Sequence, residues 1–276
     1  MSRQFPSTLV AVSFSTRKAL LPAWMVQHAA VVAGVAGLDI DATSPVGAWL
    51  AARSRTAHAS YVPVRSIWVA AEDIHSARNR RLIESLVKHH PDRRPLVVAL
   101  LSHGSTLREI TRSVEPARLA SQQWPIALGL PSTSLRGGRP HLVQLGGIRR
   151  FAEEWDLSIA VDLSGQFDPT WEAEAAIARI GERLSVLRVT AGAPSRAAVG
   201  RDRVACRALH AAIDRDQILD VAVTPVKSVP FPITPRVASS GARRAVQYIT
   251  ERAALHAQAL REGISRYEGS PSSRGV

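Results

Sequence analysis

Short apolar runs alternate with longer amphipathic stretches along most of the chain. Each run is bounded by glycine, proline, serine or charged residues, which is typical of a buried β-strand. Eight such strands are predicted, at residues 9–14, 38–41, 66–71, 95–101, 125–130, 157–165, 184–190 and 218–224. Between them, apolar residues spaced three or four apart predict helices over 22–35, 46–52, 76–89, 107–123, 142–155, 171–183 and 201–215.

This alternation of strand and helix predicts an α/β fold built on a parallel sheet. Eight strands in 276 residues favour a closed (βα)8 TIM barrel over an open doubly wound sheet. We therefore expect a single TIM-barrel domain over residues 1–265, with an extra C-terminal helix near 243–263. Residues 266–276 are rich in serine, glycine and proline and are expected to form a disordered tail.

The composition indicates a soluble globular protein, because 46% of the residues are hydrophobic and the mean hydropathy is −0.01. No apolar run approaches the roughly 20 residues that a membrane-spanning helix needs. The first residues lack the charged-then-apolar layout of a signal peptide. The single cysteine, Cys206, excludes an internal disulfide and a cysteine-rich metal site. We therefore expect a cytoplasmic protein with no membrane association.

The formal charge of +12 is carried almost entirely by arginine, since the 35 basic residues include three lysines. Residues 51–150 hold sixteen basic and six acidic side chains, whereas 151–200 hold four and eight. A basic half of this kind can attract nucleic acid, phosphorylated substrates or an acidic protein partner. The arginines are scattered, however, so we favour solvated helix faces as their role and leave the binding alternative open.

The stretch at 157–165 gives the strongest indication of a functional residue. It is an apolar strand broken by one acid, Asp162, near its C-terminal end. A buried carboxylate is costly unless it is paired, hydrogen-bonded or functional. In a barrel, this position lies at the mouth where catalytic residues gather.

The sequence lacks the motifs of several other kinds of binding or active site. No Gly-x-Gly-x-x-Gly follows the first strand and no phosphate-binding loop of the Walker type is present. Ser102, His103 and Asp162 are the residues of a conceivable catalytic triad, but no Gly-x-Ser-x-Gly nucleophile elbow accompanies them. Most of the six tryptophans fall at core positions of helices or strands, so core packing is the favoured interpretation.

Residues 151–165 (FAEEWDLSIAVDLSG) resemble the sixth-strand region of the xylose-isomerase-like barrels. The spacing continues through DPTW at 168–171 and IGERLSVLRV at 180–189, and VAGLDI at 35–40 is similar to the family's second strand. That superfamily includes sugar-phosphate isomerases and epimerases, inosose dehydratases and endonuclease IV. The resemblance covers most of the chain as an order of elements and about 142–224 as local motif.

The resemblance implies a divalent metal held by carboxylates and histidines at the ends of strands five to eight, where it would polarise substrate oxygens. Asp162 matches the strand-six ligand. The other ligand positions hold different residues: Leu130-Pro131, Gly165-Gln166, Arg188 with Thr190, and Thr224-Pro225. One match is too few for a tight site, because hard divalent ions need several donors at once. The cofactor is thus unknown, and a divalent metal stays possible.

Other acidic groups fall at strand ends. Asp39 and Asp41 lie on the second strand, and Glu72 and Asp73 end the third. His103 ends the fourth, and together with Asp162 these groups make a displaced metal site conceivable, with Asp162 and Glu72 as the residues assigned to it. We favour a plainer interpretation in which the Glu72-Asp73 pair caps the next helix and Asp39 or Asp41 faces solvent. Likewise, we interpret His75 and His103 as ordinary loop histidines rather than metal ligands.

Basic groups at the ends of strands one, seven and eight suggest an anion-binding site. They are Arg17, Lys18, Arg188 and Lys227. Arg188 lies within a strand and so needs an acidic partner, for which Asp162 on the neighbouring strand is the obvious candidate. Such a pair is equally consistent with a structural salt bridge and with a substrate clamp.

Together these features and the resemblance suggest a sugar or sugar-phosphate isomerase- or epimerase-like enzyme. Asp162 would serve as metal ligand or base. Arg188, the second catalytic residue, would hold an anionic substrate together with Lys227, and Lys18 and His103 would also bind this small anionic or sugar substrate. The alternative is a catalytically degenerate barrel that binds a ligand, an acidic protein or nucleic acid through its basic surface.

Overall fold

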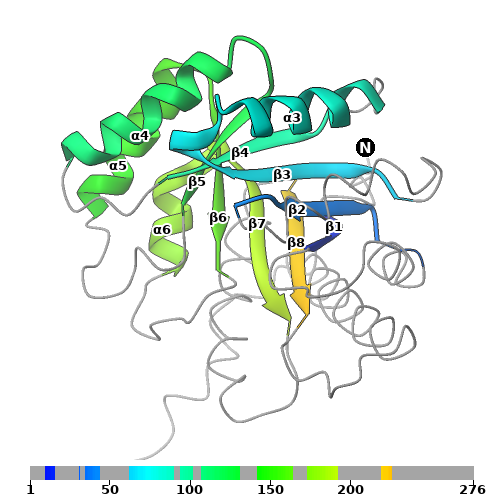
Figure 1. Ribbon diagram of the computed structural model, residues 1–276. Helices are drawn as coiled ribbons and strands as arrows, with labels where there is room; N and C mark the ends of the chain where they lie inside the picture. Colours follow the sequence, from blue (N-terminus) through cyan, green and yellow to red (C-terminus); the bar gives the residue numbers. More distant parts are fainter. Residues whose placement is uncertain are drawn as a thin grey trace, which may run out of the picture.

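The computed structural model describes residues 10–15, 31, 35–43, 62–89, 94–101, 107–130, 142–163, 173–191 and 219–225. Its strands all run parallel, each paired with the next along the chain, and the last also pairs with the first. The sheet therefore closes into a barrel (Figure 1). The strands are β1 (Val10–Ser15), β2 (Gly37–Asp41), β3 (Val64–Ala70), β4 (Leu96–Leu100), β5 (Ile126–Leu130), β6 (Ser158–Asp162), β7 (Leu184–Ala191) and β8 (Leu219–Pro225).

Four helices follow β3 to β6 in turn and lie outside the sheet (Figure 1). They are α3 (Ala77–His89), α4 (Leu107–Ala120), α5 (Leu142–Glu154) and α6 (Ala173–Ile180), with short 3-10 helices η1 (Ala71–Asp73) and η3 (Gly181–Arg183). The predicted α/β TIM-barrel-like alternation is thus confirmed in the middle of the chain. Apart from residues 31 and 35, the helix expected over 22–35 lies outside the described residues, as do those expected over 46–52, 201–215 and 243–263 and the tail 266–276.

The start of α3 corrects one prediction. The backbone N–H of Asn79 donates to Ser76 Oγ over 3.3 Å, so Ser76 is the residue that caps this helix. Glu72 and Asp73 instead form η1, where both side chains are exposed. Asp73 contributes through its backbone carbonyl, which accepts from the Asn79 side-chain amide over 2.9 Å. The prediction that Glu72 and Asp73 cap the helix was therefore wrong.

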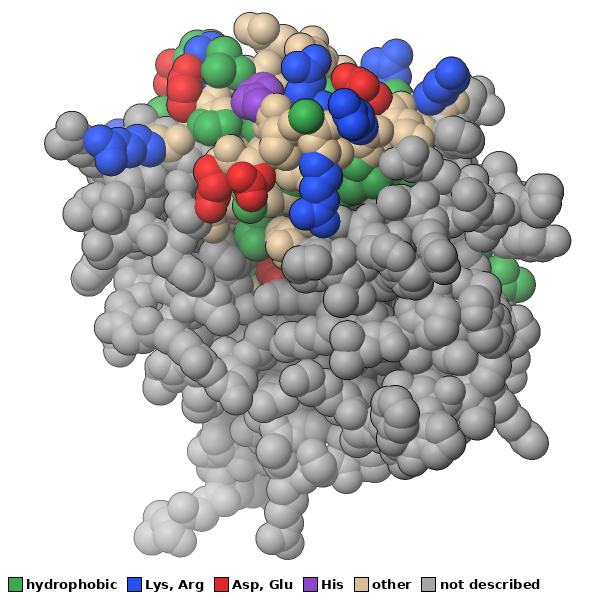
Figure 2. All heavy atoms as spheres, viewed as in Figure 1, with side chains coloured by type: hydrophobic (Ala, Val, Ile, Leu, Met, Phe, Trp, Pro, Cys, Tyr) green, Lys and Arg blue, Asp and Glu red, His purple; other side chains and the backbone are tan. Residues whose placement is uncertain are grey.

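The outer helix faces mix charges of both signs, as Figure 2 shows. Several of the arginines pair with acids: Arg80 with Glu84, Arg118 with Glu115, Arg149 with Glu153 and Arg183 with Asp156. The hydrogen bonds from Arg118 lower the pKa of the Glu115 carboxyl. Trp155 departs from the predicted core packing of tryptophans, since it is 40% exposed with Arg118 stacked over its ring. Among the described helices, none is long and apolar enough to cross a bilayer.

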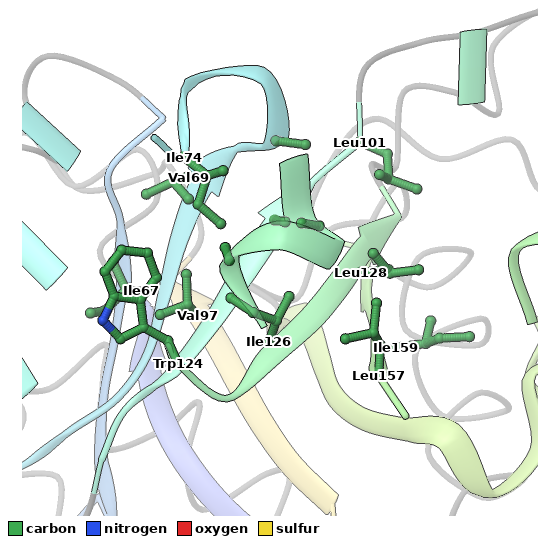
Figure 3. Packing of buried hydrophobic residues seen from close by; sticks show 14 of the residues in the cluster. Ile67, Val69, Ile74, Val97, Leu101, Trp124, Ile126, Leu128, Leu157 and Ile159 are labelled. Atoms are coloured by element: carbon green, nitrogen blue, oxygen red, sulfur yellow. The ribbon is translucent and has the colours of Figure 1, made fainter. Parts of the chain in front are cut away.

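Strands β2 to β6 have two buried faces, because successive side chains point to opposite sides and both sets are buried. The outward side chains, such as Ile67 on β3 and Leu128 on β5, pack against the surrounding helices and loops in one large apolar core (Figure 3). The inward side chains form a second, smaller cluster centred on Trp68, with Ala127 and Ala160 among its members. In this described part of the interior, Trp68 is the largest apolar side chain and lies against smaller ones.

Gly129 on β5 belongs to this interior, and its lack of a side chain is needed for the packing. A Cβ atom there would lie 2.8 Å from Val98 Cγ1, 3.1 Å from Leu100 Cα and 3.2 Å from Trp68 Cζ3. We therefore expect Gly129→Ala to lower the free energy of unfolding by about 1–3 kcal/mol, as overpacked cores do. Urea denaturation measures this effect.

Gly146→Ala in α5 is the matched control. Its Cβ would meet the Arg179 guanidinium at 3.6 Å, which is an ordinary contact. Alanine also suits a helix better than glycine, by roughly 0.5–1 kcal/mol, so this variant should be slightly more stable than the wild type. Equal stability losses in the two variants would show that the interior packing of Gly129 is not tight.

Candidate functional site

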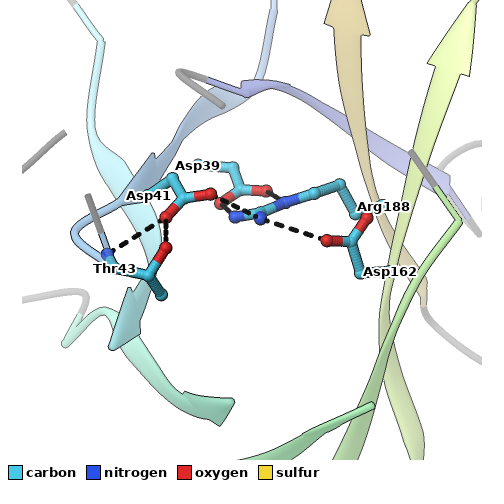
Figure 4. Close-up of polar contacts among 5 residues, drawn as sticks. All are labelled: Asp39, Asp41, Thr43, Asp162 and Arg188. Carbon is cyan, nitrogen blue, oxygen red and sulfur yellow. Dashed lines mark hydrogen bonds and ion pairs between the residues drawn. The ribbon is translucent and has the colours of Figure 1, made fainter. Parts of the chain in front are cut away.

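The barrel interior contains a cluster of buried charges near the carboxyl ends of the strands. Asp39 and Asp41 come from β2, Asp162 from β6 and Arg188 from β7 (Figure 4). All four residues are at most 6% exposed. We call these four residues the buried charge cluster.

The strand period places these side chains inside the barrel. On β2, Leu38 and Ile40 join the outer apolar core, so Asp39 and Asp41 point the opposite way. On β6 and β7, Asp162 and Arg188 are register partners on adjacent strands. One arginine therefore lies beside one aspartate and opposite two others.

Asp39 is the principal partner of Arg188. The guanidinium Nε donates to Asp39 Oδ2 over 2.9 Å and Nη2 donates to Asp39 Oδ1 over 2.7 Å. This two-point geometry is the strongest arrangement available to an arginine and a carboxylate. The contact joins residues 149 positions apart, so it links β2 to β7 across the barrel.

The remaining aspartates contact the same guanidinium through Nη1. This nitrogen donates to Asp41 Oδ2 over 3.2 Å and lies 3.6 Å from Asp162 Oδ2. Asp41 also accepts, at Oδ1, the backbone N–H of Thr43 over 3.1 Å and the Thr43 hydroxyl. Asp41 therefore ties the cluster to the chain as it leaves β2 at the carboxyl end.

One face of the guanidinium rests on an aromatic ring. Arg188 Cζ lies 3.9 Å from the centroid of the Trp68 ring, a cation–π distance. Trp68 is fully buried, and its Nε1 finds no hydrogen-bond partner among the described residues. Four residues thus fix the guanidinium: three carboxylates around it and one indole against its face.

This geometry corrects two predictions. The expectation that Asp39 or Asp41 faces solvent was wrong, because in a closed barrel the second face of a strand points into the interior. The predicted Asp162–Arg188 pair is present as the 3.6 Å ion pair, but Asp39 holds the arginine more closely. The period-two pattern of β2, read together with barrel closure, was the signal that could have found Asp39 and Asp41.

No protein-family model matches this sequence, and no curated protein matches it. Solved structures do match the fold. A D-psicose 3-epimerase with D-tagatose, from Clostridium cellulolyticum H10, is similar over 91% of this chain and 98% of its own, at 12% identity and a TM-score of 0.52. Another D-psicose 3-epimerase, in the presence of D-fructose, covers 86% of this chain and 97% of its own, at 10% identity and a TM-score of 0.58.

A third match is a xylose isomerase-like TIM barrel/4-hydroxyphenylpyruvate dioxygenase fusion protein, at 14% identity and a TM-score of 0.51, covering 94% of this chain and 45% of its own. This chain has the fold of the xylose-isomerase-like TIM barrels. The resemblance seen in the sequence is thereby confirmed for the fold.

Within the xylose-isomerase-like fold, the structure brings together two of the predicted site residues, Asp162 and Arg188. Glu72 is exposed on η1, away from the buried interior. His75 contacts the Pro116 carbonyl oxygen through Nε2 at 3.0 Å, as a loop histidine that joins η1 to α4. The predicted substrate-binding residues lie outside the described residues: Lys18, His103 and Lys227.

Proposed function

We propose that this chain is a complete (βα)8 barrel, with an additional C-terminal helix, that acts as a sugar or sugar-phosphate isomerase- or epimerase-like enzyme. The reaction would take place at the carboxyl-end mouth, where β6 ends at Asp162. The observation that carries the proposal is a buried carboxylate at this strand end, 3.6 Å from a fixed guanidinium. The likeness in fold to two D-psicose 3-epimerases supports the choice of a sugar as substrate.

In the proposed reaction, Asp162 transfers a proton. Isomerases and epimerases of ketoses remove a proton from a carbon next to a carbonyl group and return it elsewhere or to the other face. A neighbouring guanidinium favours the ionised form of a carboxylate, which is the form that a general base needs. Lys18, His103 and Lys227 would bind the hydroxyl or phosphate groups of the substrate. A cytoplasmic location is part of this proposal.

Asp162→Asn tests the assignment of the base. Asparagine keeps the size of the side chain and cannot accept the proton, so turnover should fall by about 10²–10⁴-fold. The measurement is ketose and ketose-phosphate conversion in deuterated water, followed by NMR as exchange at the carbon next to the carbonyl. Asp156→Asn, at an exposed surface turn, is the control and should leave the rate unchanged. Full turnover by the Asp162 variant would remove this mechanism.

A second candidate is a barrel without catalysis that binds a ligand, an acidic protein or nucleic acid through its basic residues. One observation favours it: the Arg188 guanidinium is engaged by Asp39 and Asp41 within the protein. This candidate predicts no turnover of any ketose or ketose phosphate that is tested. It also requires an affinity for an acidic partner that falls steeply with added salt.

A further inference from the structure

A divalent ion at Asp162 would need a particular arrangement of ligands. Magnesium sits about 2.0–2.1 Å from its oxygen ligands and calcium about 2.3–2.6 Å, and both need several oxygens directed at one point. In the buried charge cluster, the oxygens of three carboxylates are directed at one point. That point is occupied by the guanidinium of Arg188.

Among the described residues, the contacts of Arg188 leave no place for a second cation between the three carboxylates. Nη1 lies between Asp41 Oδ2 at 3.2 Å and Asp162 Oδ2 at 3.6 Å, where an ion bound to both carboxylates would have to lie. Both oxygens of Asp39 already accept from Nε and Nη2, and Oδ1 of Asp41 accepts from Thr43. Trp68 closes one face of the guanidinium at 3.9 Å.

Electrostatic repulsion by Arg188 also disfavours a metal ion in the cluster. An arginine side chain stays protonated over the whole pH range in which proteins fold. A divalent ion next to a fixed positive charge is strongly disfavoured in an interior of low dielectric constant. In addition, the described part of the chain contains no group of three or more His, Cys, Asp or Glu side chains that could hold a metal ion. The described residues around Asp162 do not fit the divalent metal that the resemblance implies.

We infer that Arg188 is the permanent cation of the buried charge cluster and stands in the place of a divalent metal at Asp162. The barrel is therefore metal-independent at this position. The inference rests on the contacts within the cluster and goes beyond the proposed function, since it applies to the enzyme and to the binding protein alike. A failure of the Asp162→Asn activity test would leave it unaffected.

The first test measures metal binding by the wild-type protein. Protein purified without a histidine tag is dialysed against excess Mn²⁺, Zn²⁺ and Mg²⁺ and then desalted, and its metal content is measured by mass spectrometry. We expect no stoichiometric metal and no change in melting temperature with the added ions. A near-stoichiometric metal that is lost in Asp162→Asn would overturn the inference.

The second test removes the resident cation. Arg188→Ala should lower the melting temperature, and millimolar guanidinium or Mn²⁺ should restore about 2–4 °C of the loss by occupying the vacated place. Neither ion should stabilise the wild type. Arg188→Lys keeps a positive charge, and should fold without either ion even if the alanine variant does not fold. A folded alanine variant that no cation stabilises, or a lysine variant that requires Mn²⁺, would contradict the assignment.

Discussion

Arg188→Met is expected to lower the free energy of unfolding by about 3–5 kcal/mol, the cost of breaking a buried ion pair from one side. Methionine fills much of the same volume, so the loss comes from charge rather than from a cavity. Asp39 would lose its two-point partner and Asp41 one of its hydrogen bonds, both in the barrel interior. Equilibrium urea denaturation at neutral pH measures the difference.

Arg183→Met is the matched control for this prediction. Arg183 pairs with Asp156 at 2.6 Å, but the Asp156 side chain is 92% exposed. Exposed ion pairs contribute about 0–1 kcal/mol, so the control should change stability little. Similar losses for both variants at neutral pH would show that Arg188 is not a central part of the fold.

Trp68→Ala is expected to cost a similar amount, about 3–5 kcal/mol, by opening a cavity in the barrel interior. Trp68 is fully buried among the small side chains of Ala127 and Ala160, which cannot collapse into the space of an indole. The substitution also removes the ring on which the Arg188 guanidinium rests. Urea denaturation again reports the loss.

Two further variants separate volume from hydrogen bonding at this site. Trp68→Phe keeps an aromatic ring, and the indole Nε1 that it removes has no hydrogen-bond partner among the described residues. Its cost should therefore be well below that of alanine. Trp155→Ala removes a tryptophan that is 40% exposed and should also cost much less. A phenylalanine variant as unstable as the alanine variant would indicate that the indole nitrogen has a role that the packing does not explain.

The strands could be predicted from the sequence because their signal is local. The run ending at Asp162 is apolar enough to be read as a buried strand without knowledge of its neighbours, and β6 and β7 lie within the predicted ranges to within a residue. The ends of the helices were harder to predict, because helix capping depends on a single side chain. Ser76 and Asp73 are equally good capping residues by composition, and the backbone path selects Ser76.

The buried charge cluster was predicted only in part. The Asp162–Arg188 pair joins adjacent strands, so the order of the strands was enough to propose it. The stronger Asp39–Arg188 contact crosses the barrel between β2 and β7. Finding it requires barrel closure, the inward direction of Asp39 and the reach of the arginine side chain. The strand count predicted the first and the period of two along β2 carries the second, but no sequence pattern gives the third. The substrate-binding role of Lys18, His103 and Lys227 stays a prediction.

A crystal structure from crystals grown in manganese chloride, with data collected at the manganese absorption edge, would show which cation lies among the three aspartates. We predict guanidinium density in contact with Asp39, Asp41 and Asp162, and no anomalous peak within coordination distance of Asp162. An anomalous peak bound to Asp162, with Arg188 displaced from the carboxylates, would contradict it.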